Sequence, residues 1–166
     1  MITFERITPA SAFVFKTIRL RALQSDPTAF GSTYAKESLL SEEDWLLRSR
    51  RWNDDGSIGY LAFDRENACG LVACYTDEQD PQRAHVISMW VDPAWRRAGV
   101  GTALIEGLRL WPASRKMREL KLMVTSVNDN AIRFYERLGF RMSGKTGPYP
   151  NDPAITEYEM LLPLTP

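Results

Sequence analysis

The chain has 166 residues, 21 lysines and arginines, 21 aspartates and glutamates, and a formal net charge of zero. This length suits a single domain, residues 1–166, with a sizeable core. Zero net charge argues against a nucleic-acid partner or a membrane-surface partner. No apolar run reaches bilayer length, and the early acidic residue does not fit a signal peptide, so we expect a cytoplasmic protein.

The pattern of apolar residues predicts an α/β domain in which strands and helices alternate. Ser41 to Asp44 has the form of a capping box and predicts the start of a helix. Residues 147–153 are rich in proline and glycine and predict a loop. In chain order we expect a strand over 2–7, helices over 10–24, 31–38 and 41–53, strands over 57–64, 69–77 and 83–91, a helix over 100–115, a strand over 119–124, a helix over 129–138, and strands over 140–145 and 154–162.

The two cysteines and the single histidine restrict redox and metal chemistry. Cys69 and Cys74 lie five residues apart on one predicted strand, and an odd separation places them on opposite faces. We therefore expect no disulfide bond between them and two reduced thiols. Because His85 is the only histidine, we also expect no metal site.

The segment after the strand over 83–91 is the most informative part of the chain. A short basic loop with Gly99 and Gly101 leads into a predicted helix, and this arrangement offers several N–H donors to one anion. The P-loop pattern is absent because no lysine precedes Thr102, and the dinucleotide fingerprint fails because its third glycine position is Leu104. This segment alone is compatible with two interpretations, a phosphate-binding site and an ordinary tight turn between a strand and a helix.

A second motif after the next predicted strand identifies a family resemblance. Asn128, Ala131, Tyr135, Gly139 and Phe140 fit the pattern N-x-x-A-x-x-x-Y-x-x-x-G-F, and Arg96, Gly99 and Gly101 fit [RQ]-x-x-G-x-[GA]. Together the two segments resemble the GNAT superfamily of N-acetyltransferases. The resemblance implies a mixed central sheet of six to seven strands, splayed in the middle and flanked by helices. The strands near 86–91 and 120–124 would splay apart around the pantetheine arm of acetyl-CoA, next to a β-bulge.

The resemblance also implies a role for each matched residue. Asn128 would contact the pantetheine arm, and Tyr135, two helical turns later on the same face, would stabilise the leaving thiolate. The side chain of Trp90 would either line the acceptor pocket or fill the core, and that of Arg97 would either contact phosphate or lie in solvent. Backbone groups would bind the acetyl and pantetheine groups at Met89, Trp90 and Val91, and the pyrophosphate at Arg96, Arg97, Ala98, Gly99, Val100, Gly101 and Thr102.

The general base is where this sequence departs from the family pattern. Many members have a glutamate five positions before the asparagine, and this chain has Met123 there. An acceptor with a low pKa, such as an α-amino group, would need no strong base. Ser88 would be placed to hold a water molecule. The substitutes that stay open are Glu37, Glu42, Glu43, Asp77 and His85, the last acting through water.

The expected function is transfer of an acetyl group from acetyl-CoA to a primary amine by direct attack on the thioester, without a metal. Residues near 25–50 and 146–153 would border the acceptor, and their aromatic character with scattered acids favours a small-molecule or peptide amine over a polyanion. Protein N-terminal acetylation, a catalytically silent acyl-CoA-binding module and a nucleotide-binding regulator are the alternatives. Dimers are common in this fold, and a homodimer stays open.

Overall fold

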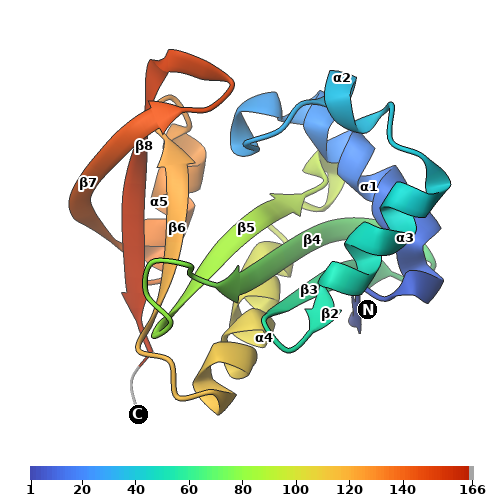
Figure 1. Ribbon diagram of the computed structural model, residues 1–166, viewed down its shortest axis with the longest axis horizontal. Coiled ribbons are helices and arrows are strands. Elements are labelled where there is room, and N and C mark those ends of the chain that lie inside the picture. Colours follow the sequence, from blue (N-terminus) through green and yellow to red (C-terminus); the bar gives the residue numbers. More distant parts are fainter. Residues whose placement is uncertain (165–166) are drawn as a thin grey trace.

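An eight-stranded mixed sheet is the frame of the protein (Figure 1), and the computed structural model describes residues 1–164. The strand order is β1-β3-β4-β5-β6-β8-β7, and the short β2 pairs with β3. Only β5 and β6 run parallel. The strands are β1 (Ile2–Arg6), β2 (Asn53–Asp54), β3 (Ser57–Asp64), β4 (Asn67–Thr76), β5 (Arg83–Val91), β6 (Glu119–Thr125), β7 (Arg141–Tyr149) and β8 (Asp152–Pro163).

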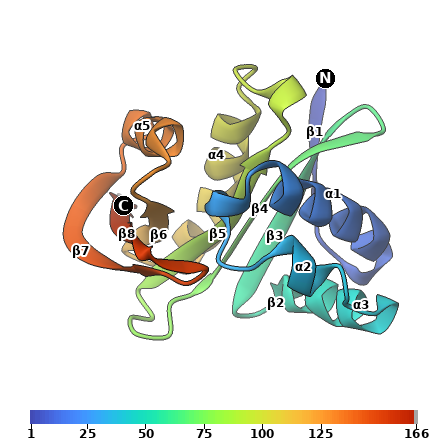
Figure 2. The same ribbon diagram turned by 90° about the horizontal axis from the view of Figure 1, so that it is seen from above.

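Helices cover both faces of this sheet (Figure 2). The α-helices are α1 (Ala12–Ser25), α2 (Tyr34–Glu37), α3 (Glu42–Arg51), α4 (Val100–Ser114) and α5 (Asp129–Arg137), and short 3-10 turns lie at η1 (Pro9–Ser11), η2 (Pro27–Ala29) and η3 (Pro93–Trp95). None of the helices in residues 1–164 combines the length and the apolar character that crossing a bilayer requires.

Most predicted elements are confirmed, and two are wrong in extent. The predicted helix over 31–38 is a single turn, Tyr34–Glu37. The predicted loop over 147–153 is mostly strand, because β7 and β8 continue to a turn at Pro150 and Asn151. The capping box is confirmed, since the Ser41 hydroxyl accepts from the Asp44 amide at 3.1 Å and the Asp44 carboxylate accepts from the Ser41 amide at 2.9 Å.

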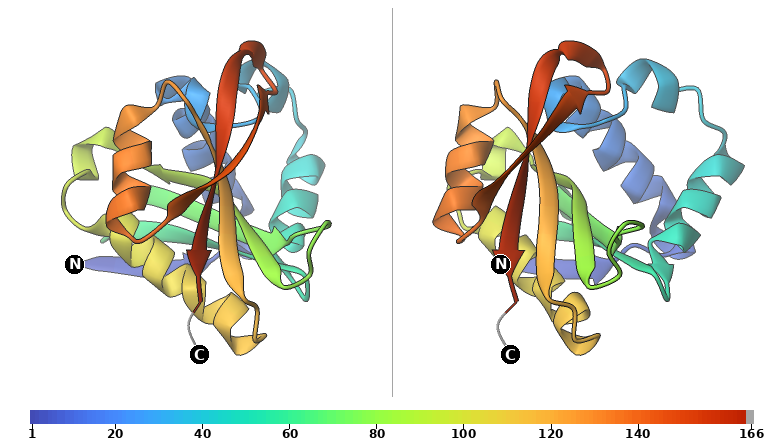
Figure 3. Two further views of the ribbon diagram at one scale, coloured as in Figure 1. Left: turned by 90° about the vertical axis from the view of Figure 1, so that its left-hand side faces the viewer. Right: turned by 60° about the vertical axis from the view of Figure 1, so that its left-hand side comes forward.

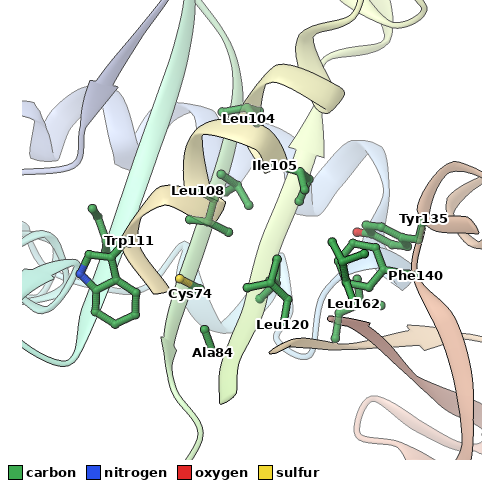
Figure 4. Packing of buried hydrophobic residues seen from close by; sticks show 14 of the residues in the cluster. Cys74, Ala84, Leu104, Ile105, Leu108, Trp111, Leu120, Tyr135, Phe140 and Leu162 are labelled. Atoms are coloured by element: carbon green, nitrogen blue, oxygen red, sulfur yellow. The ribbon is translucent and has the colours of Figure 1, made fainter. Parts of the chain in front are cut away.

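Two apolar cores hold the layers together, one on each face of the sheet. Leu104, Ile105 and Leu108 lie on one side of α4 at helical spacing and pack with Tyr135 and Phe140 (Figure 4). The second core joins α1 and α3 to the opposite face, where its fully buried members include Ile18, Trp45, Leu61 and Leu71.

The splay that the family resemblance implies lies between β5 and β6. These strands pair only from Arg83 opposite Glu119 to His85 opposite Lys121. Beyond His85 the strands diverge, so the β5 edge up to Val91 has no neighbouring strand on that side (Figure 1). The splay thus leaves peptide groups in the middle of the sheet available to another partner.

Bulges on both sides of β4 change which residues face which core. Ser88 has a positive φ of 58°, and the β4–β5 register slips where Leu71 pairs with Trp90 but Ala73 pairs with Ile87. On the other side, Ala62 pairs with Gly70 and Phe63 with Ala68. Cys69 is therefore the extra residue of a bulge.

The bulge corrects the expectation for the two cysteines. Cys69 and Cys74 were predicted on opposite faces, yet both belong to the core that packs on α4. One extra residue reverses the alternation of side chains between them. Both thiols are free, and both are buried.

Candidate active site

A cavity of about 410 Å³ lies where β5 and β6 separate. It is lined on one side by the bulged part of β5 and on the other by β6 and the start of α5. Its lining includes Arg19, Phe30, His85, Ser88, Met89, Met123, Thr125, Asn128, Tyr135, Tyr149 and Glu157. The second sequence motif therefore meets the end of β5 at this cavity, whereas residues 96–102 of the first motif lie outside its lining.

Tyr135 and Asn128 both line this cavity, as the helical spacing predicts. The side-chain oxygen Oδ1 of Asn128 caps α5 by accepting a hydrogen bond from the Ala131 backbone amide at 3.3 Å. The side-chain NH₂ group of Asn128 is thus left for a ligand. The ring of Tyr135 is held between Phe134 and Phe140, at centroid distances of 5.3 and 5.5 Å. No group in residues 1–164 hydrogen-bonds its hydroxyl, and burial raises the pKa of the phenol well above its usual value.

The glycine loop presents a row of free backbone amides. Within the described residues, no carbonyl or side chain accepts a hydrogen bond from the amides of residues 97–102. Arg97 and Gly99 have positive φ values of 62° and 82°, and such alternation turns successive N–H groups into a concave anion site. The same amides form the N-terminus of α4, whose dipole favours negative charge.

The loop lies against the second motif and the end of β5. A Cβ atom on Gly101 would come within 3.1 Å of the Met89 methyl group and within 3.1 Å of the Phe134 ring. A side chain at this position would therefore require the Met89 methyl group and the Phe134 ring to give way by a few tenths of an ångström. Gly101 thus allows the free amides to sit close to the splay.

Two of the predicted site residues use their side chains to hold the structure. Arg96 donates to the Val91 carbonyl at 2.8 Å and to the Asp26 carboxylate at 2.6 Å, so its guanidinium braces the loop. The indole N–H of Trp90 donates to the same carboxylate at 2.7 Å, and the ring is buried in the α1–α3 core. Trp90 thus fills the core, whereas Arg97 is exposed on the loop.

A clasp between distant segments roofs the cavity. The Tyr149 hydroxyl, at the tip of the β7–β8 hairpin, donates to the carbonyls of Pro27 and Phe30 at 2.9 and 2.6 Å. The Asn151 amide donates to the carbonyls of Phe30 and Ser32 at 3.1 and 2.9 Å. Figure 3 shows this hairpin tip reaching the segment around η2 across the splay. Of the aromatic residues in the segments 25–50 and 146–153, which were expected to border the acceptor, Phe30 and Tyr149 line the cavity, whereas Tyr34 and Trp45 do not.

Four of the five substitutes for the missing base lie away from the cavity or are neutralised. Glu37 is 1% exposed and accepts from Arg19 through both oxygens, at 3.0 and 2.9 Å, and from Arg48 at 3.0 Å. Despite the opposing effect of burial, these contacts lower its pKa. Asp77 is paired with Lys121 at 3.1 Å, and Glu42 and Glu43 are exposed on the first turn of α3. The hydroxyl of Ser88, which was expected to hold a water molecule, accepts a hydrogen bond from the Arg19 guanidinium at 2.9 Å.

His85 does line the cavity, but it is a weak base there. Its Nδ1 lies 2.8 Å from the Tyr75 hydroxyl. Burial, and next the charge of Lys121, lower the pKa of His85 from 6.5 to about 4. The imidazole is therefore neutral near pH 7.

We expect the free energy of unfolding of the His85→Gln variant to fall less steeply below pH 6.5 than that of the wild type. Between pH 6.5 and about 4 the unfolded chain binds a proton at His85 that the folded protein does not, so stability falls as the pH is lowered. This difference corresponds to a loss of up to about 3 kcal/mol, which the variant would not suffer. Urea denaturation at several pH values measures the free energy of unfolding of both proteins. If that free energy depended on pH in the same way in the wild type and the variant, the lowered pKa of His85 would be contradicted.

The sequence reasoning missed one carboxyl group. Glu157 on β8 lines the cavity, and burial raises its pKa. Its local pattern, Thr156-Glu157-Tyr158-Glu159, is that of an ordinary half-exposed strand. The place of β8 beside β6 in the sheet is the signal that could have found it, and that place depends on tertiary structure.

Comparison with known proteins decides the family. The profile of the acetyltransferase (GNAT) family matches residues 19–140, a span that contains both motifs. The chain belongs to the GNAT family. Its fold matches the crystal structure of a GNAT-family acetyltransferase from Streptococcus pneumoniae with a TM-score of 0.80, at 23% identity over 99% of this chain and 100% of that chain. The PaiA N-acetyltransferase from Thermoplasma acidophilum, solved in complex with coenzyme A, matches with a TM-score of 0.78 at 15% identity over 99% of each chain.

Similarity in sequence to curated proteins is partial. This GNAT chain is 37% identical over 100 residues to an uncharacterized N-acetyltransferase of Methanocaldococcus jannaschii, a match that covers 58% of this chain and 42% of that protein. For two further curated relatives, the matched part covers 58% and 38% of their length. The matched part of the chain thus spans between about two fifths and three fifths of the length of these three curated relatives.

Proposed function

We propose that this GNAT protein transfers the acetyl group of acetyl-CoA to a small primary amine that is cationic in solution. The observation that carries the proposal is the juxtaposition of the free amides of residues 97–102 with a cavity that contains the unpartnered Tyr135 hydroxyl. An anion site beside a slot in the sheet suits a ligand that has a pyrophosphate and a long, thin arm.

The residues present fit acetyl-CoA. The amides from Arg97 to Thr102 would hold the pyrophosphate, the free β5 edge from Met89 to Val91 would pair with the pantetheine arm, and Asn128 would bind that arm through its NH₂ group. When bound, the cosubstrate supplies an activated acetyl thioester. The absence of a Cβ at Gly101 keeps the amide row close to this path.

The protein's own groups would then stabilise charge on both sides of the thioester. Unpaired N–H groups of the bulged β5 edge would donate to the carbonyl oxygen as negative charge develops on it. The Tyr135 phenol would donate a hydrogen bond to the departing sulfur. Because its pKa is raised, the phenol remains protonated and acts mainly as a hydrogen-bond donor.

The clasp favours a small acceptor over a polypeptide end. Tyr149 and Asn151 tie the β7–β8 hairpin to residues 27–32, so the acceptor side of the cavity is roofed by backbone held through several hydrogen bonds. An extended peptide would need an open groove at this place. The unpartnered Tyr135 hydroxyl also argues against a silent binding module, which would have no use for it.

Calorimetry with acetyl-CoA, CoA, ATP and NAD, followed by an amine screen, tests this proposal. We expect acetyl-CoA and CoA to bind with similar dissociation constants, and ATP and NAD to bind at least about 100-fold more weakly, which corresponds to about 2.7 kcal/mol. Equal binding of ATP would favour a nucleotide-binding regulator and refute the proposal. Acetylation of peptide N-termini in preference to small amines would overturn the acceptor assignment alone.

A further inference from the structure

Glu157 occupies a distinctive position in the splayed sheet. It lies on β8 directly opposite Thr125 of β6 and Gly147 of β7. Residues directly opposite in an antiparallel pair share one face. The Thr125 hydroxyl points from this face to the Thr28 carbonyl at 3.3 Å, beneath the roof of the cavity. Glu157 thus lines the same cavity as Tyr135, on the side where η2 and the clasp enclose the acceptor space.

The Glu157 carboxylate has no protein partner. Within residues 1–164, no amide or side chain hydrogen-bonds or ion-pairs with it, and burial alone accounts for its raised pKa. The cation that lines the cavity, Arg19, is already neutralised by Glu37. Glu157 is therefore the uncompensated carboxylate of the cavity, and a half-buried carboxylate without a partner is stabilised when a cation arrives.

We propose that Glu157 is the general base of the transfer reaction, binding the ammonium form of the acceptor and taking one of its protons. This inference rests on the proposed function and replaces the base that Met123 cannot supply. The Glu157 carboxylate first takes one proton from the ammonium group and later releases it to solvent. The neutral nitrogen then uses its lone pair to form the C–N bond as the C–S bond breaks. The second amine proton passes to the sulfur, so the products are an N-acetyl amine, CoA thiol and one proton.

The surroundings of Glu157 shift its pKa in the direction that suits a base. Burial raises its pKa, whereas the pKa values of Asp26, Glu37 and Asp77 are lowered by their partners. A higher pKa makes proton acceptance more favourable. The titratable and charged groups that share the cavity or lie next to its lining are Arg19 from α1, His85 from β5, Lys121 from β6, Tyr135 from α5 and Tyr149 from β7.

Kinetics of the Glu157→Gln variant test the proposal directly. With acetyl-CoA and a panel of methylamine, putrescine, phenethylamine and glycinamide, we expect kcat to fall about 100-fold or more. The acid limb of the pH profile should also disappear. Added formate should restore part of the activity to Glu157→Ala, because it can replace a lost carboxylate and cannot repair misfolding. Asp152→Asn, on the same strand outside the cavity, is the matched control and should leave kcat unchanged.

A second readout does not depend on an acceptor. In protein with ¹³C-labelled glutamate, the Glu157 carboxyl carbon should titrate at a pH above the usual range of a glutamate side chain. Putrescine should shift its signal in wild type. Titration of Glu157 in the usual range of a glutamate side chain with no response to putrescine, or a Glu157→Gln variant with wild-type kcat, would overturn the assignment. If the wild-type protein did not bind acetyl-CoA at all, the proposed function itself would be refuted. Failure of the Glu157 assignment and failure of the proposed function are therefore distinguishable.

Discussion

Replacing Tyr135 by phenylalanine is expected to lower kcat about 100-fold and to leave the dissociation constant of acetyl-CoA nearly unchanged. The hydroxyl has no partner in the described protein and borders the cavity, so its removal deletes one hydrogen bond to the departing sulfur and no structural contact. The ring would keep its packing against Phe134 and Phe140. Steady-state kinetics and calorimetry on the same samples separate the two effects.

The matched control for this variant is Tyr158→Phe. Tyr158 lies on β8 among residues that pack on the α4 core and does not line the cavity. We expect its variant to turn over at the wild-type rate. A Tyr135→Phe variant with unchanged kcat would show that the thiolate leaves without help from the phenol. A large loss of acetyl-CoA binding would instead indicate that the hydroxyl positions the pantetheine arm.

Replacing Glu37 by glutamine is expected to destabilise the fold by about 3–5 kcal/mol at pH 7. Arg19 is 11% exposed at its side chain, and its partner Glu37 is 1% exposed, so the variant leaves a buried guanidinium without a counter-charge. Arg48 loses its partner as well. The Glu37 pKa is lowered in the folded protein, so its contribution is present above its unfolded pKa of about 4.5 and is lost as the pH falls through its folded value.

Urea denaturation of Glu37→Gln measures this loss, with Glu42→Gln as the control. Glu42 is exposed on α3 and should change the free energy of unfolding by less than about 0.5 kcal/mol. Because Arg19 also donates to Ser88 at the β5 bulge, we expect Glu37→Gln to weaken acetyl-CoA binding too. A loss of stability below about 1 kcal/mol would show that Arg19 finds water or another partner.

Local sequence was sufficient to predict most of the elements and to locate the two motifs on which the proposed cofactor site rests. The α4 core residues repeat at helical spacing, and the Ser41 capping box is complete within four residues. The glycine loop and the Asn128–Tyr135 pair are short motifs whose geometry depends on a turn and a helix. Such features depend on neighbours in the chain, and for this reason the sequence predicts them well.

Long-range pairing decided the rest. The bulge at Cys69 turned two predicted faces into one, and the pairing of β7 with β8 turned a predicted loop into the hairpin that carries the clasp. The cavity position of Glu157 follows from the parting of β5 and β6 and from the placement of β8 beside β6. By itself, then, the sequence determined most of the elements, the family and the positions of its two motifs. Only the tertiary structure decided which carboxylate faces the cavity, because strand order and register depend on contacts between residues far apart in the chain.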